Sequence, residues 1–361
     1  MLADSLPFVK EWKYNQIFTH EYNVGFHQPK GDSCDKCAEF KAIPSNLRTP
    51  EQIAVNKKHE DGKEAVRAQR HDDVAITDPK TLVVSFDLEN VFALSRTTVS
   101  SAFYKCKLNV YNLTAFVNRT KEPFCAVWTE TTAGRSGNDL ASAIIHLLEA
   151  ITSRHSDTNS LILWSDSCVP QNRNQILSYA LQLFIDTNKS IQKIIHRYCE
   201  PGHSSIQDVD TLHSNIEGAI KGLEIFSPLT LIRLLTKLNP AGKEMYVRIL
   251  KSADFKDYKS LAHCGQYEKV GYASVSELTY TASDVRTLKV RRCMSKSEAQ
   301  SFTVLKMVYL RGKKLKPLAQ PKQLPEHSEL KKKKADDLRS LLKYMDGANR
   351  IYMENIVKNA T

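Results

Sequence analysis

The chain has 361 residues, of which 42% are hydrophobic and 25% charged, a composition typical of a folded globular protein with room for two or three structural units. Its 51 Lys and Arg against 40 Asp and Glu give a net charge of +11, which favours polyanionic partners. No apolar run approaches the roughly 18 residues of a membrane span, and the charged N-terminal stretch is unlike a signal peptide. We therefore expect an intracellular protein with no membrane partner.

Residues 1–78 contain a pair of cysteines and a polar stretch. Cys34 and Cys37 have the two-residue spacing that lets one chain reversal present both thiolates to a zinc ion. They would form half of a site, and four histidines are near enough in sequence to complete it: His20, His27, His59 and His71. Two metal-free cysteines in a loop are the alternative. The stretch 50–72 is rich in helix formers and predicts an exposed helix.

Residues 79–224 have the pattern of an α/β domain. Three apolar, β-branched runs come first, TLVVSFDLEN, FYKCKLNVYNLTAFVN and EPFCAVWTE, and amphipathic helices then alternate with two further strands. Three strands in an antiparallel meander, followed by helical crossovers, predict a mixed five-stranded sheet with helices on both faces. This is the plan of the ribonuclease H-like fold.

The rest of the chain is predicted to form three parts. Residues 225–310 have short helix and strand patterns and predict an accessory α+β region. Residues 311–334 hold nine Lys or Arg, two Glu and three Pro, which predicts an extended basic linker. This linker would be a solubilising tether, a nuclear-import signal or a contact for a phosphate backbone. Residues 335–361 predict a helical tail.

Two predicted strands end in a carboxylate. Asp87 ends the first strand and Asp166 the fourth, and these strands are neighbours in a ribonuclease H-like sheet. Adjacent carboxylates raise each other's pKa unless a divalent cation neutralises them, so we expect a metal site, although Asp166 could merely close its turn. The helix after the fifth strand offers three candidates for a third carboxylate: Asp208, Asp210 and Glu217.

Two Mg²⁺ or Mn²⁺ ions at such a site would activate a water or a 3′-hydroxyl and stabilise the leaving oxygen of a phosphodiester. Asp87 would bridge the two ions, Asp166 would hold one of them, and the third carboxylate would hold the other. Glu89 and Asp139 are less suitable. Glu89 lies farther along the first strand, and Asp139 has the position of a helix cap.

Several short motifs lie along the predicted α/β domain. They are FDL at 86–88, VWTE at 127–130, WSDSC at 164–168 with QNRN at 171–174, and GHS at 202–204 continuing through Asp210 to Glu217. These motifs resemble those of transposon-derived eukaryotic proteins with a ribonuclease H-like DDE/DDD transposase domain. Upstream, YNQIF at 14–18, FHQPK at 26–30 and the DSC…C stretch at 32–37 are similar to the segment before that domain. The resemblance covers about residues 12–225 and, more loosely, 334–352.

The resemblance implies DNA strand cleavage and transfer by a nuclear protein, with DNA as partner and an oligomer on DNA. It places the recurrent Asp of the family on Asp210 and the recurrent Glu on Glu217, and it leaves open which of them binds metal. Many relatives have Gly-Gly where this chain has VP at 169–170. The family also leads us to expect a DNA-binding segment before the aromatic N-terminal stretch, and this sequence does not contain one there. These departures suggest a truncated or host-retained copy of the element.

Three residues near the expected site are candidates for contacting nucleic acid. Asn172 and Arg173 begin the helix after Asp166, and a helix N-terminus can bind phosphate, but Asn172 could equally cap that helix. His203 could contact DNA or hold a metal ligand in place, or it could simply close the strand-to-helix turn.

Two functions therefore compete. The first is a metal-dependent transposase-like nuclease or polynucleotidyl transferase, and the second is a catalytically inactive, transposon-derived DNA- or chromatin-binding protein. A ribonuclease or exonuclease on the same fold is less favoured, because the C-terminal region and basic linker suit the handling of DNA ends. No GxGxxG or GK[ST] motif follows a strand, so no nucleotide cofactor is expected.

Overall fold

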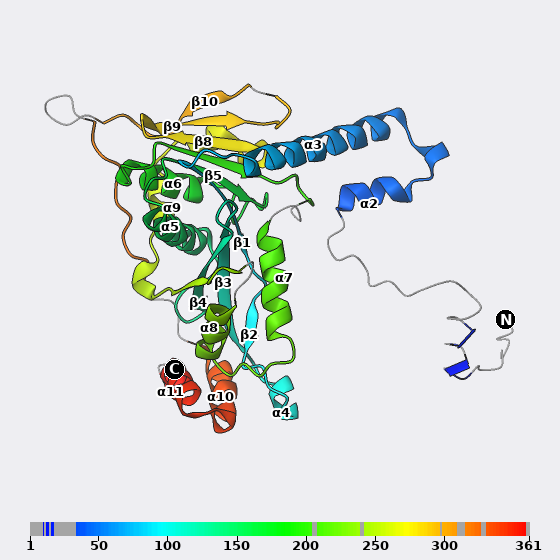
Figure 1. The fold of residues 1–361 in the computed structure, drawn as a ribbon, viewed down its shortest axis with the longest axis vertical. Coiled ribbons are helices and arrows are strands. Elements are labelled where there is room, and N and C mark those ends of the chain that lie inside the picture. The colour runs from blue at the N-terminus through cyan, green and yellow to red at the C-terminus, as the bar shows by residue number, and fades with distance from the viewer. Residues whose placement is uncertain are drawn as a thin grey trace.

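The computed structural model describes residues 10, 12–13, 16–17, 34–203, 208–238, 242–296, 298–308, 315–325 and 330–358. In these residues the chain builds a single mixed sheet with helices on both faces (Figure 1). The predicted α/β class is confirmed. The predicted number of strands is wrong, because the described sheet has ten strands rather than five.

The middle of the sheet consists of the strands that the sequence predicted. They are β1 (Thr81–Leu88), β3 (Leu108–Val117), β4 (Glu122–Thr129), β5 (Ser160–Ser165) and β6 (Lys193–Tyr198). Their order across the sheet is β4-β3-β1-β5-β6. The pairs β3–β4 and β1–β3 are antiparallel, whereas β1–β5 and β5–β6 are parallel. The first and fourth predicted strands, β1 and β5, are therefore neighbours.

The additional strands come mostly from the segment predicted as an accessory region. β7 (Tyr246–Ile249) pairs in parallel with β4 at one edge. β8 (Glu277–Thr281), β9 (Asp284–Arg291) and β10 (Gln300–Thr303) continue the sheet in antiparallel fashion from β6 at the other edge. The short β2 (Phe92–Leu94) pairs with β3. Without these additional strands, the edges of β4 and β6 would leave backbone N–H and C=O groups unpaired. β7 covers the edge of β4, and β8 covers the edge of β6.

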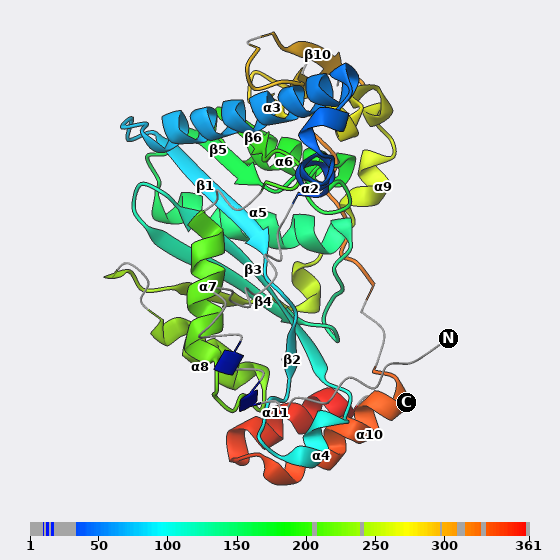
Figure 2. The same cartoon turned by 90° about the vertical axis from the view of Figure 1, so that its right-hand side faces the viewer.

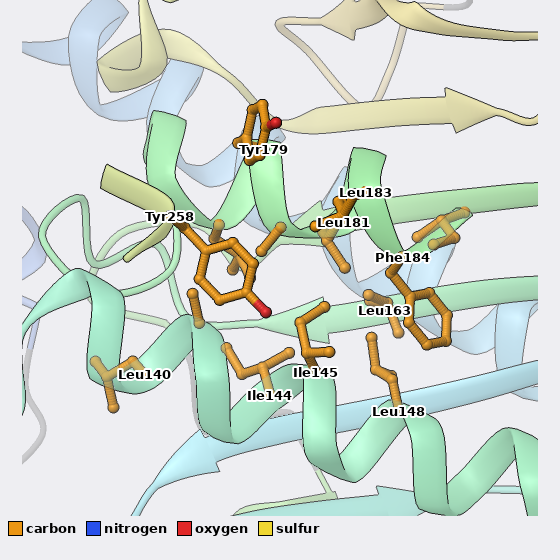
Figure 3. Close-up of a cluster of buried hydrophobic side chains, with 14 of the residues drawn as sticks. Leu140, Ile144, Ile145, Leu148, Leu163, Tyr179, Leu181, Leu183, Phe184 and Tyr258 are labelled. Atoms are coloured by element: carbon orange, nitrogen blue, oxygen red, sulfur yellow. The ribbon is translucent and has the colours of Figure 1, made fainter. Parts of the chain in front are cut away.

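One face of the sheet is covered by α5 (Gly137–Arg154), α6 (Gln175–Thr187) and α9 (Tyr258–Ala262). Apolar residues recur on α5 every three or four positions, and Leu140, Ile144 and Leu148 point toward α6 and β5 in Figure 3. Tyr258 enters the same cluster from α9. Full burial of each such aliphatic side chain contributes roughly 1.5 to 3 kcal/mol, so this layer is a principal core of the fold.

The opposite face is covered by α3 (Pro50–Val74), α7 (Asp208–Ile220) and α8 (Pro228–Lys237), with α10 (Lys332–Leu341) and α11 (Gly347–Lys358) at the lower end (Figure 2). The predicted polar helix at 50–72 is thus confirmed as α3. It packs Val66 onto Val83, Ile162 and Trp164 of the sheet. The short α2 (Asp35–Ala42) lies beside α3, and α4 (Ser100–Phe103) follows β2.

Part of the predicted basic linker is packed against the body. Leu318 is buried, and its backbone N–H donates to the Asp186 carboxylate at 3.0 Å. The Ala319 carbonyl accepts from the Tyr179 hydroxyl at 2.8 Å. Residues 315–325 are therefore extended, as predicted, but they are not a free tether, and residues 332–334 already belong to α10. None of the helices in the described part of the chain combines the length and apolar character needed to cross a membrane.

Candidate metal centres

Asp87 and Asp166 lie at the same end of two neighbouring strands. The parallel pairing of β1 with β5 sets Ser85 opposite Trp164, and each aspartate follows two residues later. Because side chains alternate along a strand, both aspartates share the sheet face of Val83 and Trp164, which α3 and α7 cover. The sequence prediction that these two carboxylates approach each other is therefore consistent with the register of the strands.

Helix α7 brings two more polar side chains to Asp87. Ligand atoms of Asp87, Asp210 and His213 all lie within 4.8 Å of one another, a spacing that could hold a metal ion. Asp210 and His213 are three residues apart, so both face the sheet from the first turns of the helix. The sequence analysis did not include His213. Its i,i+3 spacing from a candidate metal ligand was the signal that could have identified it.

The acidic residues of this cluster strongly influence each other's ionisation. Burial raises the pKa of Asp87 to about 7, and the negative charges of Asp166 and Asp210 contribute to the rise. Burial likewise raises the pKa of Glu89 to about 8, with Glu217 and Asp87 adding to the effect. Bringing these carboxylates together in ionised form is therefore unfavourable unless a cation compensates their charge.

His213 is a neutral member of the cluster. Burial lowers the pKa of its imidazole to about 4, so the ring carries no charge near neutral pH. Its Nε2 atom is in hydrogen-bond contact with the Thr114 hydroxyl on β3. The neutral His213 ring could therefore supply a nitrogen ligand to a metal ion, but it does not offset the negative charge of the aspartates.

The turn after β5 fixes the Asp166 carboxylate. Its Oδ1 atom accepts a hydrogen bond from the Asn172 side-chain amide and another from the Cys168 backbone N–H at 3.2 Å. Asn172 is buried, and it does not cap the helix that follows. The N-cap of α6 is Asn174, whose side chain accepts from the first backbone N–H groups of the helix.

Arg173 and Asn172 do not lie where the sequence analysis expected a phosphate contact. Arg173 is only 8% exposed, and its Nη1 atom donates to the Val275 carbonyl at 3.1 Å. The chain after residue 225 thus covers the start of α6, which the sequence pattern of α6 alone did not reveal. Asn172 therefore supports the turn that carries Asp166, Arg173 joins the start of α6 to Val275, and neither side chain is exposed.

The other candidates for the third carboxylate are engaged elsewhere. Asp208 forms an ion pair with Arg70 of α3 at 2.7 Å. Glu217 lies two turns beyond Asp210 on α7, where it accepts a hydrogen bond from Asn90 at 3.2 Å. The three-residue cluster around Asp87 thus includes Asp210 and neither of these two.

The two carboxylates that the sequence analysis ranked lower have clear structural partners. Glu89 is buried and accepts from the Asn112 amide at 2.7 Å. The N-cap of α5 is Ser136 rather than Asp139, and Asp139 accepts from the Ser136 backbone N–H at 2.8 Å as the third residue of a capping box.

A second cluster lies at the N-terminal side of the structure. Ligand atoms of four residues are within 4.8 Å of one another and could hold a metal ion: Cys34, Cys37, His59 and His203. His59 was one of the four histidines proposed from the sequence. His71 is 85% exposed near the end of α3 and is outside the cluster, whereas His20 and His27 lie outside the described residues.

His203 is the member that the sequence analysis assigned differently. It was expected to contact DNA or to support the aspartate site, but its Nε2 atom lies 3.5 Å from Cys37 Sγ. The two residues are 166 positions apart in the chain, so no local spacing indicated that they meet.

Comparisons of the chain with protein-family models, with curated proteins and with solved structures find no match. The similarity to transposases noted in the sequence motifs remains a prediction. The functional interpretation of the two clusters accordingly depends on their own residues and geometry.

Proposed function

We propose that the chain is a DDE/DDD-type transposase-like protein that cleaves and joins DNA strands with the help of divalent metal ions. The observation that carries this proposal is the gathering of Asp87, Asp166 and Asp210, from two neighbouring parallel strands and one helix, at one end of the sheet. The strand order β4-β3-β1-β5-β6 supports a ribonuclease H-like core within the larger sheet.

The donor set suits hard divalent cations. Asp87, Asp166 and Asp210 supply carboxylate oxygens, the ligands that Mg²⁺ and Mn²⁺ prefer. The raised pKa of Asp87 reflects burial and the charges of its two acidic neighbours, and a cation would relieve this repulsion. Two such ions held there would supply an activated water or 3′-hydroxyl and stabilise the leaving oxygen of a phosphodiester.

The protein's own residues would orient this chemistry. The charges of both Asp166 and Asp210 act on Asp87, so Asp87 is the residue that we propose to bridge the two ions. Asn172 and the Cys168 backbone hold the Asp166 carboxylate in one orientation. Such supporting contacts keep ligands in position before substrate arrives.

DNA is the partner that we propose for this site. The net charge of +11 favours a polyanion, and the motifs similar to transposases favour DNA over RNA. The same motifs are the basis for proposing a nuclear location and assembly of an oligomer on DNA.

The decisive experiment is a nicking assay on supercoiled plasmid DNA with Mn²⁺ or Mg²⁺. We expect metal-dependent nicking by the full chain and a loss of roughly a hundredfold or more in Asp166→Asn, because a metal ligand contributes several kcal/mol to the transition state. Asp157→Asn, at an exposed turn after α5, is the matched control and should retain activity. Nicking that is equal in both variants would exclude the proposed site.

The same assay separates the alternatives. Salt-sensitive DNA binding without nicking in either metal would identify a catalytically inactive DNA- or chromatin-binding protein. Parallel reactions with RNA and with an RNA–DNA duplex would reveal a ribonuclease if only these substrates are cleaved. Asp210→Asn and Glu217→Gln then distinguish the two candidates for the third ligand, and we expect the larger loss in Asp210→Asn.

A further inference from the structure

We infer that Cys34, Cys37, His59 and His203 together form one structural zinc site, which fastens the α2–α3 hairpin to the turn after β6. From the sequence, zinc was expected at Cys34 and Cys37, with His20, His27, His59 and His71 as candidates to complete the site. The structure selects His59 of α3 from these and adds His203 from the turn that follows β6. This inference does not depend on the carboxylate site or on DNA cleavage.

The distances between the ligand atoms match those of a four-coordinate zinc site. Bond lengths of about 2.0 Å to nitrogen and 2.3 Å to sulfur place the ligand atoms of a tetrahedron about 3.3 to 3.8 Å apart. Cys34 Sγ lies 3.4 Å from His59 Nε2, and Cys37 Sγ lies 3.5 Å from His203 Nε2. The two Nε2 atoms are 3.1 Å apart. Two of these three distances lie in that range and the third is slightly shorter, and all four donor atoms lie within 4.8 Å of one another.

The type and number of donors favour zinc in a structural role. Two thiolates with two imidazoles form a soft donor set that suits Zn²⁺ and not Mg²⁺. Four protein ligands leave no position for substrate, which is the pattern of structural rather than catalytic zinc. All eight cysteines of the chain, including Cys34 and Cys37, are free thiols, so no disulfide competes for these two sulfurs.

Glu200 supports the orientation of His59. The Nδ1 atom of His59 is buried and lies 3.3 Å from Oε1 of Glu200, without the alignment of a hydrogen bond. With the proton on Nδ1 facing this carboxylate, the lone pair of Nε2 points toward the two cysteines and His203. Carboxylate partners of this kind commonly set the tautomer of zinc-binding histidines.

Gly202 lets the turn after β6 approach the cysteines. Its φ of +78° lies in the left-handed region, and a Cβ atom at this position would be 2.9 Å from Sγ of Cys34. Only glycine fits both conditions without displacing the sulfur. His203, the next residue, is thereby brought within reach of Cys37.

Helix α2 and the N-terminal half of α3 have little else to hold them, whereas the C-terminal half of α3 is attached to the body through Val66, Arg70 and Asp73. In Figure 1 the N-terminal half of α3 and all of α2 extend beyond the sheet, and α2 contains no buried residue. A hairpin without an apolar core gains little from hydrophobic packing. Metal coordination is the usual way in which so small a unit is fixed, because zinc binding contributes directly to folding.

The test is the metal content of the purified, tag-free full chain, measured by elemental mass spectrometry. We expect about one zinc per chain. Cys34→Ser and His203→Ala should each lower zinc to background. Two controls should retain it, Cys264→Ser at an exposed cysteine and His71→Ala at an exposed histidine on α3.

Cobalt substitution and a ligand exchange keep the inference testable if a variant is unstable. Co²⁺ added to the metal-free chain should give the visible spectrum of a tetrahedral thiolate site, and Cys34→Ser should abolish it. His203→Cys preserves a donor and should retain zinc where His203→Ala does not. A wild-type chain with neither zinc nor this cobalt spectrum, or equal zinc in Cys34→Ser and Cys264→Ser, would overturn the inference.

The outcome is separable from that of the nicking assay. Asp166→Asn should bind zinc as the wild type does, since Asp166 is not among the four ligands. A chain that binds zinc but nicks no DNA would support the zinc site and contradict the proposed enzyme. A chain that nicks DNA but binds no zinc would support the enzyme and contradict the zinc site.

Discussion

Arg70 of α3 forms an ion pair at 2.7 Å with Asp208, the first residue of α7. The guanidinium also donates to the Asn118 side chain at 3.0 Å, just beyond the end of β3. The Arg70 side chain is only 6% exposed, so these partners replace the water that would otherwise solvate its charge. Asp208 lies two residues before Asp210 on α7. The ion pair with Arg70 therefore holds the start of α7 next to the carboxylate site.

Removing the Asp208 carboxylate should destabilise the fold. Asp208→Ala leaves a buried arginine without its anionic partner, and we expect a loss of about 1 to 3 kcal/mol in the free energy of unfolding. Asp208→Asn keeps an acceptor oxygen toward Arg70 and should lose less. Urea denaturation followed by circular dichroism measures both. Equal stability of Asp208→Ala and the wild type would show that the pair is not formed in solution.

Gly202→Ala should disrupt the zinc site more than a comparable change elsewhere. Gly222, just after α7, has a φ of +77°, nearly the same as Gly202, but no atom lies within 4 Å of a Cβ there. Both alanine variants carry the penalty of roughly 1 to 2 kcal/mol for a left-handed residue. Only Gly202→Ala displaces Cys34. We therefore expect weaker zinc retention against a chelator in Gly202→Ala alone, and an equal effect of the two changes would argue against the close approach.

Asp87→Asn should stabilise the metal-free protein. Burial and the charges of Asp166 and Asp210 raise the pKa of Asp87 to about 7, so the folded state loses stability as the pH rises from the ordinary value of 3.8 through about 7. At a pH above 7 and in the presence of EDTA, the neutral variant should melt higher, by roughly 1 to 2 °C per kcal/mol regained. Added Mn²⁺ should then raise the melting temperature of the wild type more than that of the variant. A lower metal-free melting temperature in Asp87→Asn would contradict this.

His196 should make the fold sensitive to acid. It is fully buried on β6 between the hydroxyls of Ser165 and Tyr198, and burial lowers its pKa to about 3. The unfolded chain, with an ordinary pKa of 6.5, takes up a proton that the folded state excludes, so stability falls as the pH drops below about 6.5. The loss between pH 6.5 and pH 5 is about 2 kcal/mol from this group.

The check on this pH dependence is the variant His196→Gln, which cannot titrate. Its unfolding free energy, measured by urea denaturation at several pH values, should depend less on pH between 6.5 and 5 than that of the wild type. The comparison uses the slope and not the absolute stability, because glutamine also changes the packing around Tyr198. Parallel curves for the two proteins would exclude His196 as the source.

The sequence was sufficient to predict the middle of the sheet and the pairing of the two strands that lead to Asp87 and Asp166. Long apolar runs bounded by polar turns mark β1, β3 and β5, and the order of strands and helices then limits which strands can be neighbours. The carboxylates follow from that order, because Asp87 lies at the end of β1 and Asp166 comes directly after β5.

The rest of the site depends on contacts that sequence spacing does not encode. The edge strands β7 and β10 have four residues each and take their register from the strands they pair with. Likewise, Arg173 is buried because Val275 folds over it from a later part of the chain. His203 reaches the cysteines only because β6 ends beside the α2–α3 hairpin. These are tertiary contacts, and short sequence windows do not contain them.

Helix α3 makes three separate attachments along its length. His59 belongs to the cysteine and histidine cluster, Arg70 pairs with Asp208, and Asp73 accepts from the Trp164 indole at 2.8 Å. An α-helix hardly stretches, so these three points, spread over roughly 21 Å, must shift together. Trp164 precedes Asp166 by two residues. Because α3 is rigid and contacts Trp164, we expect any movement of the α2–α3 hairpin to be transmitted along α3 to the strand that leads to Asp166.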